Sequence, residues 1–217
     1  MITAIACVFN TGTEFYIGQN NDLLFDIRSD KRFFRNYIKR KTLICGYKTY
    51  KTLPKDIIES HMVIVLTKNH YKEFDHIDRL DHFIFSYTNK VLACQDINEI
   101  LEVANKFTHK GFVVIGGGEI YKLFESYIDF WHLTMVDDCI YDPIELANNN
   151  AVKIPFVPKK LEYNYTDHGL SSHLIEYDYK TETNIKFIIR TYYRVHDVSR
   201  NYFELQEAQK LVKEYVR

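Results

Sequence analysis

An acidic residue between apolar segments is the first candidate for proton chemistry in this sequence. Asp30 lies in the segment IGQNNDLLFDIRSDKRFF, which runs from Ile17 to Phe34. A carboxyl group among apolar side chains ionises less readily, so its pKa rises toward the range that proton transfer requires. An aspartate in the first turn of a helix can also simply complement the helix dipole. The position of Asp30 alone does not separate these two interpretations.

A glycine triplet marks a possible phosphate-binding turn. Gly116 to Gly118 stand between the apolar run FVVI and the helix-like segment EIYKLF. Glycines let a backbone approach a phosphate closely, and the free N–H groups of a helix start favour an anion there. A tight turn without a ligand explains the triplet equally well, because it lacks the full G-x-G-x-x-G pattern.

A second turn of this kind, G-Y-K-T-Y, follows the apolar run TLIC. Lys48 and Thr49 offer a positive charge and a hydroxyl donor that suit a pyrophosphate, and Thr67 and Lys68 end the next predicted strand. Open α/β sheets bind nucleotides at the carboxyl ends of their strands, so these side chains are candidate ligands. Taken singly, each lysine is better explained as a solvated surface residue.

The overall composition is that of a globular protein without a bulk attraction to polyanions. Hydrophobic residues make up 46% of the 217 residues, and 28 Lys plus Arg stand against 29 Asp plus Glu. This balance gives no reason to expect nucleic acid or an anionic membrane as a partner. The four cysteines form no C-x-x-C pair, which predicts free thiols and no metal site. Without a signal-like start or a run near the roughly 20 apolar residues of a membrane span, we expect a cytoplasmic protein.

Short apolar runs alternate with amphipathic segments up to residue 137. The runs ITAIACVF, TLICG, MVIVLT, HFIFS and GFVVIGGG predict buried strands. Amphipathic helices are predicted over residues 29–39, with Ser29 as the cap, and over residues 96–107. A βαβα order with almost fully apolar strands predicts an α/β fold, with a mixed, mainly parallel central sheet and flanking helices.

The C-terminal part shows more alternation. HLIEYDY and IKFIIRTYYRV are joined by the polar KTETN, which predicts an antiparallel hairpin at the edge of the sheet. Residues 140–158, with three consecutive asparagines and the two prolines of P-F-V-P, are predicted to form an irregular loop. We expect one domain over residues 1–196 and an amphipathic helical extension over residues 197–217. The sequence does not decide between a monomer and a homodimer.

Together these segments resemble the dihydrofolate reductase family across most of the chain. The motifs that match in order are ITAIACVF, IGQNNDLLFDIRSD, TLICGYKTYKTLP, MVIVLTK, VVIGGGEIY and HLTMVD. The resemblance implies an NADPH-dependent oxidoreductase of one-carbon metabolism and tetrahydrofolate biosynthesis. It implies reduction of dihydrofolate, its small-molecule substrate, by hydride transfer to C6 of the pterin with protonation at N5.

The resemblance also implies roles for individual residues. The implied catalytic residues are Asp30, its hydrogen-bond partner Thr134, and Phe25 as a wall of the pocket. The implied substrate-binding residues are Ile5, Cys7, Phe34, Leu53, Ile115 and Tyr121. The implied cofactor-binding residues are Ile17, Gly46, Lys48, Thr49, Thr67, Lys68, Gly116, Gly117, Gly118, Glu119 and Ile120, with a cis peptide between Gly116 and Gly117.

Several positions depart from the family pattern. Leu-Phe at residues 24–25 replaces Pro-Trp, Lys31 replaces an apolar residue after the acid, and Tyr47 stands where arginine is common. The arginine that clamps the glutamate tail of folate has no match, since residues 59–61 are Glu-Ser-His. A histidine is a poor substitute for a bidentate guanidinium, so we expect weak binding of the tail.

Two alternatives to a dihydrofolate reductase stay open. A reductase of the same fold, acting on another pterin or on a riboflavin-pathway pyrimidine, would share the glycine turn, but we expect it to lack an acid at position 30. A catalytically degenerate binding or structural module would fit the missing tryptophan and arginine. The presence of Asp30, Thr134 and the glycine turn argues against that module.

Overall fold

The computed structural model describes residues 1–76, 91–106, 111–137, 140–155, 163–164, 174–194, 206–207 and 210–211. The chain divides into two compact units, each built from two stretches of sequence. The first unit contains residues 1–3 and 38–128, and the second contains residues 4–37 and 129–217. The single domain expected over residues 1–196 stays a prediction. Most of the predicted C-terminal extension, and the predicted strand HFIFS, lie outside the described residues.

The first unit is built on parallel strands, as the continuous apolar runs predict. β4 (Thr42–Gly46) lies between β8 (Phe112–Val114) and β5 (Val63–Leu66), and β7 (Val91–Cys94) and β6 (Asp75–His76) follow β5. All four pairings are parallel. A strand that is buried on both faces exposes none of its side chains to solvent. This explains why these segments are continuous apolar runs without alternating polar residues.

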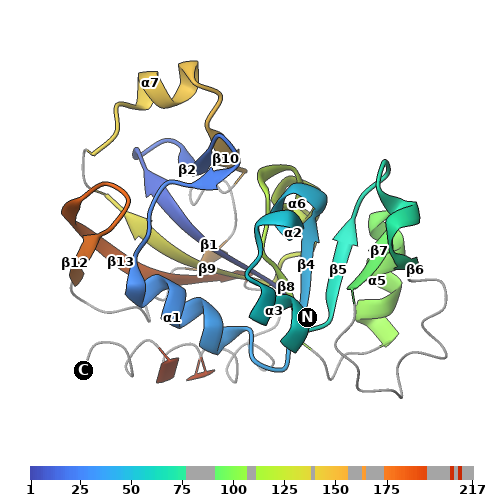
Figure 1. The fold of residues 1–217 in the computed structure, drawn as a ribbon. Helices are drawn as coiled ribbons and strands as arrows, with labels where there is room; N and C mark the ends of the chain where they lie inside the picture. The colour runs from blue at the N-terminus through green and yellow to red at the C-terminus, as the bar shows by residue number, and fades with distance from the viewer. Residues whose placement is uncertain are drawn as a thin grey trace. The chain divides into compact units, whose positions relative to one another are not determined.

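Helices connect these strands, because a parallel pair needs a crossover. The crossover helices are α2 (Tyr47–Thr52), α3 (Lys55–Ser60) and α5 (Ile97–Lys106). The helix α6 (Gly118–Phe124) follows β8, and short 3-10 turns lie at Tyr71–Glu73 and Glu125–Tyr127. α5 confirms the helix predicted over residues 96–107, and it buries Ile100, Val103 and Ala104. Figure 1 shows α5 beside β7, with which it makes contacts.

The second unit is mostly antiparallel. β13 (Thr183–Arg194) pairs with β9 (Phe130–Val136) along one edge and with β12 (Leu174–Asp178) and β11 (Tyr163–Asn164) along the other. β1 (Ile2–Asn10) neighbours β9 and pairs with β2 (Phe15–Gln19), which also pairs with β3 (Asp22–Leu23) and β10 (Val152–Ile154). The pairing of β12 with β13 confirms the predicted hairpin, and the mixed α/β architecture is the predicted one.

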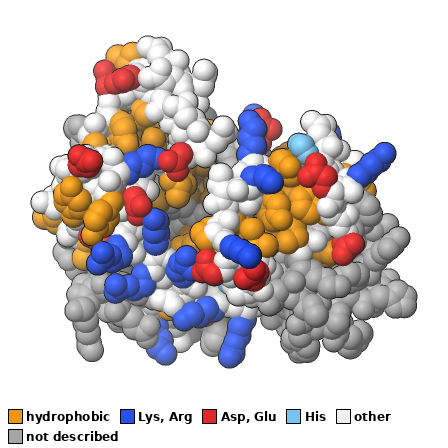
Figure 2. All heavy atoms as spheres, in the orientation of Figure 1, with side chains coloured by type: hydrophobic (Ala, Val, Ile, Leu, Met, Phe, Trp, Pro, Cys, Tyr) orange, Lys and Arg blue, Asp and Glu red, His pale blue; other side chains and the backbone are white. Residues whose placement is uncertain are grey.

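The helix α1 (Arg28–Tyr37) packs one face into the core of the second unit. Its buried Phe33 and Tyr37 contact the ring of His132 on β9, with centroids 6.1 and 4.4 Å apart. The exposed face of α1 is basic, and Figure 2 shows several Lys and Arg side chains in this region. The exposed basic residues are Arg28, Lys31, Arg32 and Arg35.

The predicted cap of α1 is wrong. The helix begins at Arg28, and the carbonyl of Ile27 accepts the N–H of Lys31 at 3.0 Å. Ser29 therefore lies inside the first turn. Its own N–H donates to the carboxylate of Glu176, at 3.3 and 3.2 Å from the two oxygens. The sequence suggested that a local side chain would cap the first turn of α1. Instead, Glu176 from a strand far away in the sequence accepts the N–H of Ser29.

The predicted loop over residues 140–158 is also wrong in part. α7 (Pro143–Asn148) begins with proline at its first position, and the side chain of Asp142 accepts the N–H of Ile144 at 2.8 Å. β10 follows α7 and pairs with β2. Figure 1 shows α7 projecting beyond β2 and β10. The asparagines mark the end of a short helix, where Asn150 adopts a positive φ of 55°.

Among the described residues, every helix is too short or too polar to cross a membrane. The same part of the chain contains no group of three or more His, Cys, Asp or Glu side chains placed to hold a metal ion.

Candidate active site

The predicted acid and its partner meet in the second unit. The carboxylate of Asp30, in the first turn of α1, accepts a hydrogen bond from the hydroxyl of Thr134, which is buried in β9. Burial raises the pKa of Asp30 from 3.8 to about 6, although the Thr134 hydrogen bond and the charge of Lys31 lower it. The charge of Glu176 raises it further. Asp30 therefore exchanges a proton closer to neutral pH than an ordinary aspartate does.

Cys7 on β1 lies near this acid. Burial raises the pKa of the Cys7 thiol well above its ordinary value, and the charges of Asp30 and Asp178 raise it further, so Cys7 stays a neutral thiol. Ile5 is buried on the same strand, and Phe34 is half-buried on α1. The structure thus brings Cys7 close enough to Asp30 for the charge of the acid to affect the thiol.

Phe25 is held by an aromatic cluster that the sequence did not reveal. Its buried ring meets the edge of Tyr141 at a centroid distance of 5.7 Å and lies 6.4 Å from the ring of Phe9. The hydroxyl of Tyr141 donates to the carbonyl of Leu24 at 2.9 Å. Tyr141 comes from the segment predicted as an irregular loop, and no local sequence signal distinguished it.

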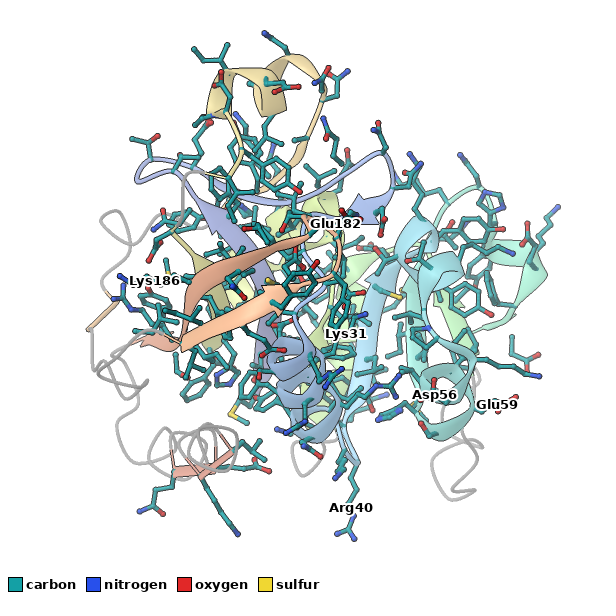
Figure 3. The ribbon with its side chains drawn as sticks, turned by 60° about the vertical axis from the view of Figure 1, so that its left-hand side comes forward. Lys31, Arg40, Asp56, Glu59, Glu182 and Lys186 are labelled. Carbon is teal, nitrogen blue, oxygen red and sulfur yellow. The ribbon has the colours of Figure 1, made fainter. Side chains whose placement is uncertain are left out.

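The turn of the β12–β13 hairpin anchors the segment of residues 22–27 that leads into α1. The carboxylate of Asp178 is fully buried and accepts the N–H of Asp26. It also accepts the N–H and the hydroxyl of Thr181 at 2.9 and 2.6 Å. Lys180 donates to the carboxylate of Asp22 at 2.7 Å. Figure 3 labels Glu182 at this turn and Lys31 on α1. The sequence predicted only a polar turn here.

Replacing Asp178 with alanine is expected to lower the free energy of unfolding by about 2–4 kcal/mol, because several donors lose a buried acceptor. Urea and thermal unfolding would measure the change. The control is Glu182→Gln, which removes an exposed acid from the same turn and should leave stability within about 0.5 kcal/mol of the unsubstituted protein. Equal stability of the two variants would contradict this account of Asp178.

The two glycine-containing turns lie together in the first unit. The N–H of Gly46 donates to the carbonyl of Gly116 at 2.9 Å. A β-carbon on Gly46 would lie 3.1 Å from Cγ1 of Ile120, and one on Gly117 would lie 3.5 Å from the hydroxyl oxygen of Thr49. The peptide bond between Gly116 and Gly117 is cis. These contacts hold the ends of β4 and β8 together, with Ile120 and Thr49 packed against the glycines.

Gly116 has a conformation that other residues rarely adopt. Its φ is +112°, and a β-carbon there would lie 3.3 Å from the ring of Tyr121. The preceding residue, Ile115, donates its N–H to the carbonyl of Ile44 at 2.9 Å. Gly118 and the exposed Glu119 begin α6. A side chain at position 116 would therefore strain the backbone and press on the ring of Tyr121.

The predicted hydroxyl and cationic side chains lie at the ends of neighbouring strands. Thr67 directly follows β5 and is half-buried, with its N–H bound to the carbonyl of Cys94 at 2.9 Å. Lys48 on α2 and Lys68 are exposed. Leu53, half-buried, ends α2. Of the predicted cofactor residues, Ile17 alone belongs to the second unit, where it lies on β2.

An aromatic and acidic cluster surrounds Tyr47 at the start of α2. The ring of Tyr47 stacks on His70 with centroids 3.6 Å apart and an interplanar angle of 4°. The Tyr47 hydroxyl donates to the carboxylate of Glu73 at 3.1 Å, and the same carboxylate contacts Nδ1 of His70 at 2.6 Å. The sequence did not reveal this cluster, because Tyr47 and His70 lie on different crossovers.

His61 is engaged with its own helix. Its ring is buried, and Nδ1 lies 3.0 Å from the carbonyl of Ile57 and 2.8 Å from the hydroxyl of Ser60. Figure 3 shows Glu59 on the same helix, α3, pointing away from the strands. Residues 59–61 thus present no guanidinium and no outward histidine in place of the missing arginine.

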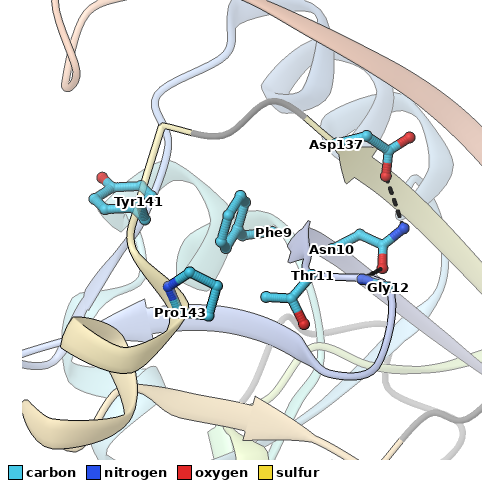
Figure 4. Close-up of a pocket in the computed structure, with 7 residues that line it drawn as sticks. All are labelled: Phe9, Asn10, Thr11, Gly12, Asp137, Tyr141 and Pro143. Carbon is cyan, nitrogen blue, oxygen red and sulfur yellow. Dashed lines mark hydrogen bonds between the residues drawn. The ribbon is translucent and has the colours of Figure 1, made fainter.

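A separate pocket of about 410 Å³ opens in the second unit beside the end of β1 (Figure 4). The amide of Asn10 donates to Asp137 at 2.7 Å and its carbonyl oxygen accepts the N–H of Gly12 at 2.9 Å. The predicted substrate and cofactor residues do not line it. Its lining residues are Phe9, Asn10, Thr11, Gly12, Asp137, Tyr141 and Pro143.

Comparison with known proteins identifies the family. The model of the family described as dihydrofolate reductase matches residues 1–144, and the chain therefore belongs to the dihydrofolate reductase family. Dihydrofolate reductase of Lactococcus lactis is 23% identical over 122 residues, which are 56% of this chain and 65% of that protein. Segregation and condensation protein A of Mycoplasma pneumoniae is 27% identical over 129 residues, 59% of this chain and 22% of that protein. The chain thus aligns with less than two thirds of the length of each relative.

Proposed function

We propose that this protein is an NADPH-dependent dihydrofolate reductase that converts dihydrofolate to tetrahydrofolate in the cytoplasm. The observation that carries the proposal is the hydrogen-bonded pair of Asp30 and Thr134, with the pKa of Asp30 raised to about 6 by burial. Membership of the dihydrofolate reductase family supports it. The free thiols of Cys7, Cys45 and Cys94 fit a reducing compartment.

The protein's own residues would orient the pterin and manage its proton. When bound, NADPH supplies the hydride for C6 of the pterin. Asp30 would accept hydrogen bonds from the N3 and 2-amino edge of the ring, and its raised pKa favours protonation at N5, through water if it does not donate directly. Thr134 fixes the direction of the carboxylate. The apolar residues Ile5, Phe25 and Phe34 would exclude water from the ring.

The first unit has residue types that fit a dinucleotide. Glycines at positions 46, 116 and 117 let the two turns pack closely against Ile120, Tyr121 and Thr49, and the absence of a side chain also lets a phosphate approach a glycine backbone closely. Lys48, Thr49, Thr67 and Lys68 offer the positive charge and hydroxyl groups that a pyrophosphate and a 2′-phosphate require. Ile17, Gly118, Glu119 and Ile120 are proposed to complete the cofactor contacts, and Leu53, Ile115 and Tyr121 those of the substrate.

A direct assay tests the activity. Purified protein mixed with NADPH and dihydrofolate should lose the absorbance of the reduced nicotinamide, with tetrahydrofolate as the product. Circular dichroism and a cooperative thermal transition would establish that the protein is folded. Folded protein that binds NADPH but produces no tetrahydrofolate would contradict the reductase proposal and favour a binding module.

The environment of His61 leads to a prediction about the folate tail. Without a guanidinium clamp, kcat/KM for dihydrofolate should exceed that for a tail-less dihydropterin by no more than about tenfold. A charge-assisted clamp would give about 10- to 100-fold through its 1.5–3 kcal/mol. Steady-state kinetics on the two substrates measures the ratio. A preference well above tenfold would show that another group binds the tail.

A further inference from the structure

The first turn of α1 is held by a carboxylate from a strand far away in the sequence. The N–H of Ser29, one residue before Asp30, lies 3.3 and 3.2 Å from the two carboxylate oxygens of Glu176. First-turn N–H groups have no acceptor within the helix, and a negative charge is favoured at this end. Glu176 therefore both satisfies a donor and brings a negative charge to the turn that contains Asp30.

On the strand that carries Glu176, acidic side chains face inward and apolar side chains face solvent. Glu176 and Asp178 lie on the same face of β12, because successive side chains of a strand point to opposite sides. Both accept backbone N–H groups of the chain between residues 26 and 29. The alternate residues Ile175 and Tyr177 are 73% and 44% exposed. An edge strand normally buries its apolar side and exposes its charges. Here the acids face inward, which costs stability unless they serve the segment they contact.

The charges around Asp30 come from several elements. Lys31 on α1 lowers the pKa of Asp30, but its ammonium also pairs with the carboxylate of Asp26 at 2.6 Å. Glu176 on β12 raises that pKa. Cys7 on β1 is a neutral thiol, and Thr134 on β9 contributes a neutral hydrogen bond. Among these groups, Glu176 is the one whose charge favours the protonated acid.

We propose that Glu176 is a positioning residue of the active site, which holds the first turn of α1 through Ser29 and uses its negative charge to keep a proton on Asp30. The catalytic consequence rests on the proposed reductase function, whereas the electrostatic effect on Asp30 does not. The family match ends at residue 144, so this role lies in the part of the chain beyond it.

The variant Glu176→Gln separates charge from hydrogen bonding, because its amide oxygen still accepts the N–H of Ser29. The apparent pKa of Asp30, followed by carbon NMR of labelled aspartate carboxyls in the protein without ligands, should fall by about 0.5–1 pH unit. Asp30→Asn identifies the resonance. Glu182→Gln, which removes a nearby acid of the same hairpin, should leave the titration unchanged. An unchanged titration in Glu176→Gln overturns the proposal.

A purely structural role predicts a different set of results. In that case Glu176→Ala would lower the melting temperature, and Glu176→Gln would behave as the unsubstituted protein in every measurement. Under our proposal, Glu176→Gln keeps its melting temperature but loses about 3- to 10-fold in kcat/KM at neutral pH, and its pH profile shifts to lower pH with the NMR titration. If the unsubstituted protein fails to reduce dihydrofolate, the reductase proposal fails, and the NMR titration still decides the role of Glu176.

Discussion

Replacing Asp30 with asparagine is expected to lower kcat/KM for dihydrofolate by about 10²- to 10⁴-fold, the usual contribution of a positioned proton-handling group. Asparagine keeps an oxygen that accepts the hydrogen bond of Thr134, so the loss reflects the missing proton chemistry and not a collapsed site. In the unsubstituted protein, kcat/KM should fall as the pH rises through the pKa of Asp30, at about 6. The variant should lose this dependence.

The same substitution is expected to stabilise the fold at neutral pH. The pKa of Asp30 is about 6 in the folded protein, against an ordinary value of 3.8, so the folded state binds the proton more tightly. The penalty for the buried charge is absent below pH 3.8, grows between pH 3.8 and about 6, and is complete above that range. It amounts to at most about 3 kcal/mol. Asparagine, which never ionises, removes it.

Unfolding by urea at pH 4 and pH 8, together with steady-state kinetics, would measure both effects. Thr134→Val serves as the comparison, since it removes the hydrogen bond while leaving the carboxyl group in place. It should raise the pKa of Asp30, because this hydrogen bond lowers it. An Asp30→Asn protein that is both active and no more stable at pH 8 would contradict the buried-acid account.

Replacing Gly116 with alanine is expected to weaken NADPH binding by about tenfold or more and to lower stability by about 1–3 kcal/mol. The φ of +112° is strained for alanine, and its β-carbon would press on Tyr121 at 3.3 Å. Relief of this contact requires either the ring of Tyr121 or the turn between β8 and α6 to shift. Titration of the reduced-nicotinamide fluorescence measures the affinity, and thermal unfolding measures the stability.

Gly12 offers a control that is matched in backbone conformation. Its φ is +88°, and no atom lies within 4 Å of the place where a β-carbon would stand. Gly12→Ala should therefore cost about 1 kcal/mol of stability from strain alone and leave NADPH affinity unchanged. Equal affinities in the two variants would show that the Gly116 turn does not contact the cofactor.

The parallel part of the fold was predictable because its strands are buried on both faces. The three runs that predict these strands are almost entirely apolar: TLICG, MVIVLT and FVVI. The strands β4, β5 and β8 lie within them. The short helix α7 was missed because the asparagines that follow it were interpreted as loop residues. Its start, Asp142 followed by Pro143, is a recognisable N-terminal signal. The Asp-Pro pair is therefore the local signal that predicts α7.

The candidate site was predictable only in part, for a physical reason. Asp30 and Thr134 follow from motif order, and their hydrogen bond shows that the predicted pair meets. Glu176 and Asp178 could not be inferred, because acids alternating with Ile175 and Tyr177 indicate a solvated acidic face. In the folded protein the two acids instead face inward, because they bind backbone N–H groups of Asp26 and Ser29, while Ile175 and Tyr177 face solvent.

The contacts of the β12–β13 hairpin also bear on the order in which the molecule is made. During synthesis, Asp30 and Thr134 emerge from the ribosome before residues 176–181, which bind the start of α1 and the segment ahead of it. A nascent chain of residues 1–144 contains both Asp30 and Thr134, but it lacks β13, which pairs with β9 beside Thr134. In such a chain Asp30 would also lack the neighbouring charge of Glu176. Asp30 therefore acquires its final proton affinity only when the β12–β13 hairpin docks during synthesis.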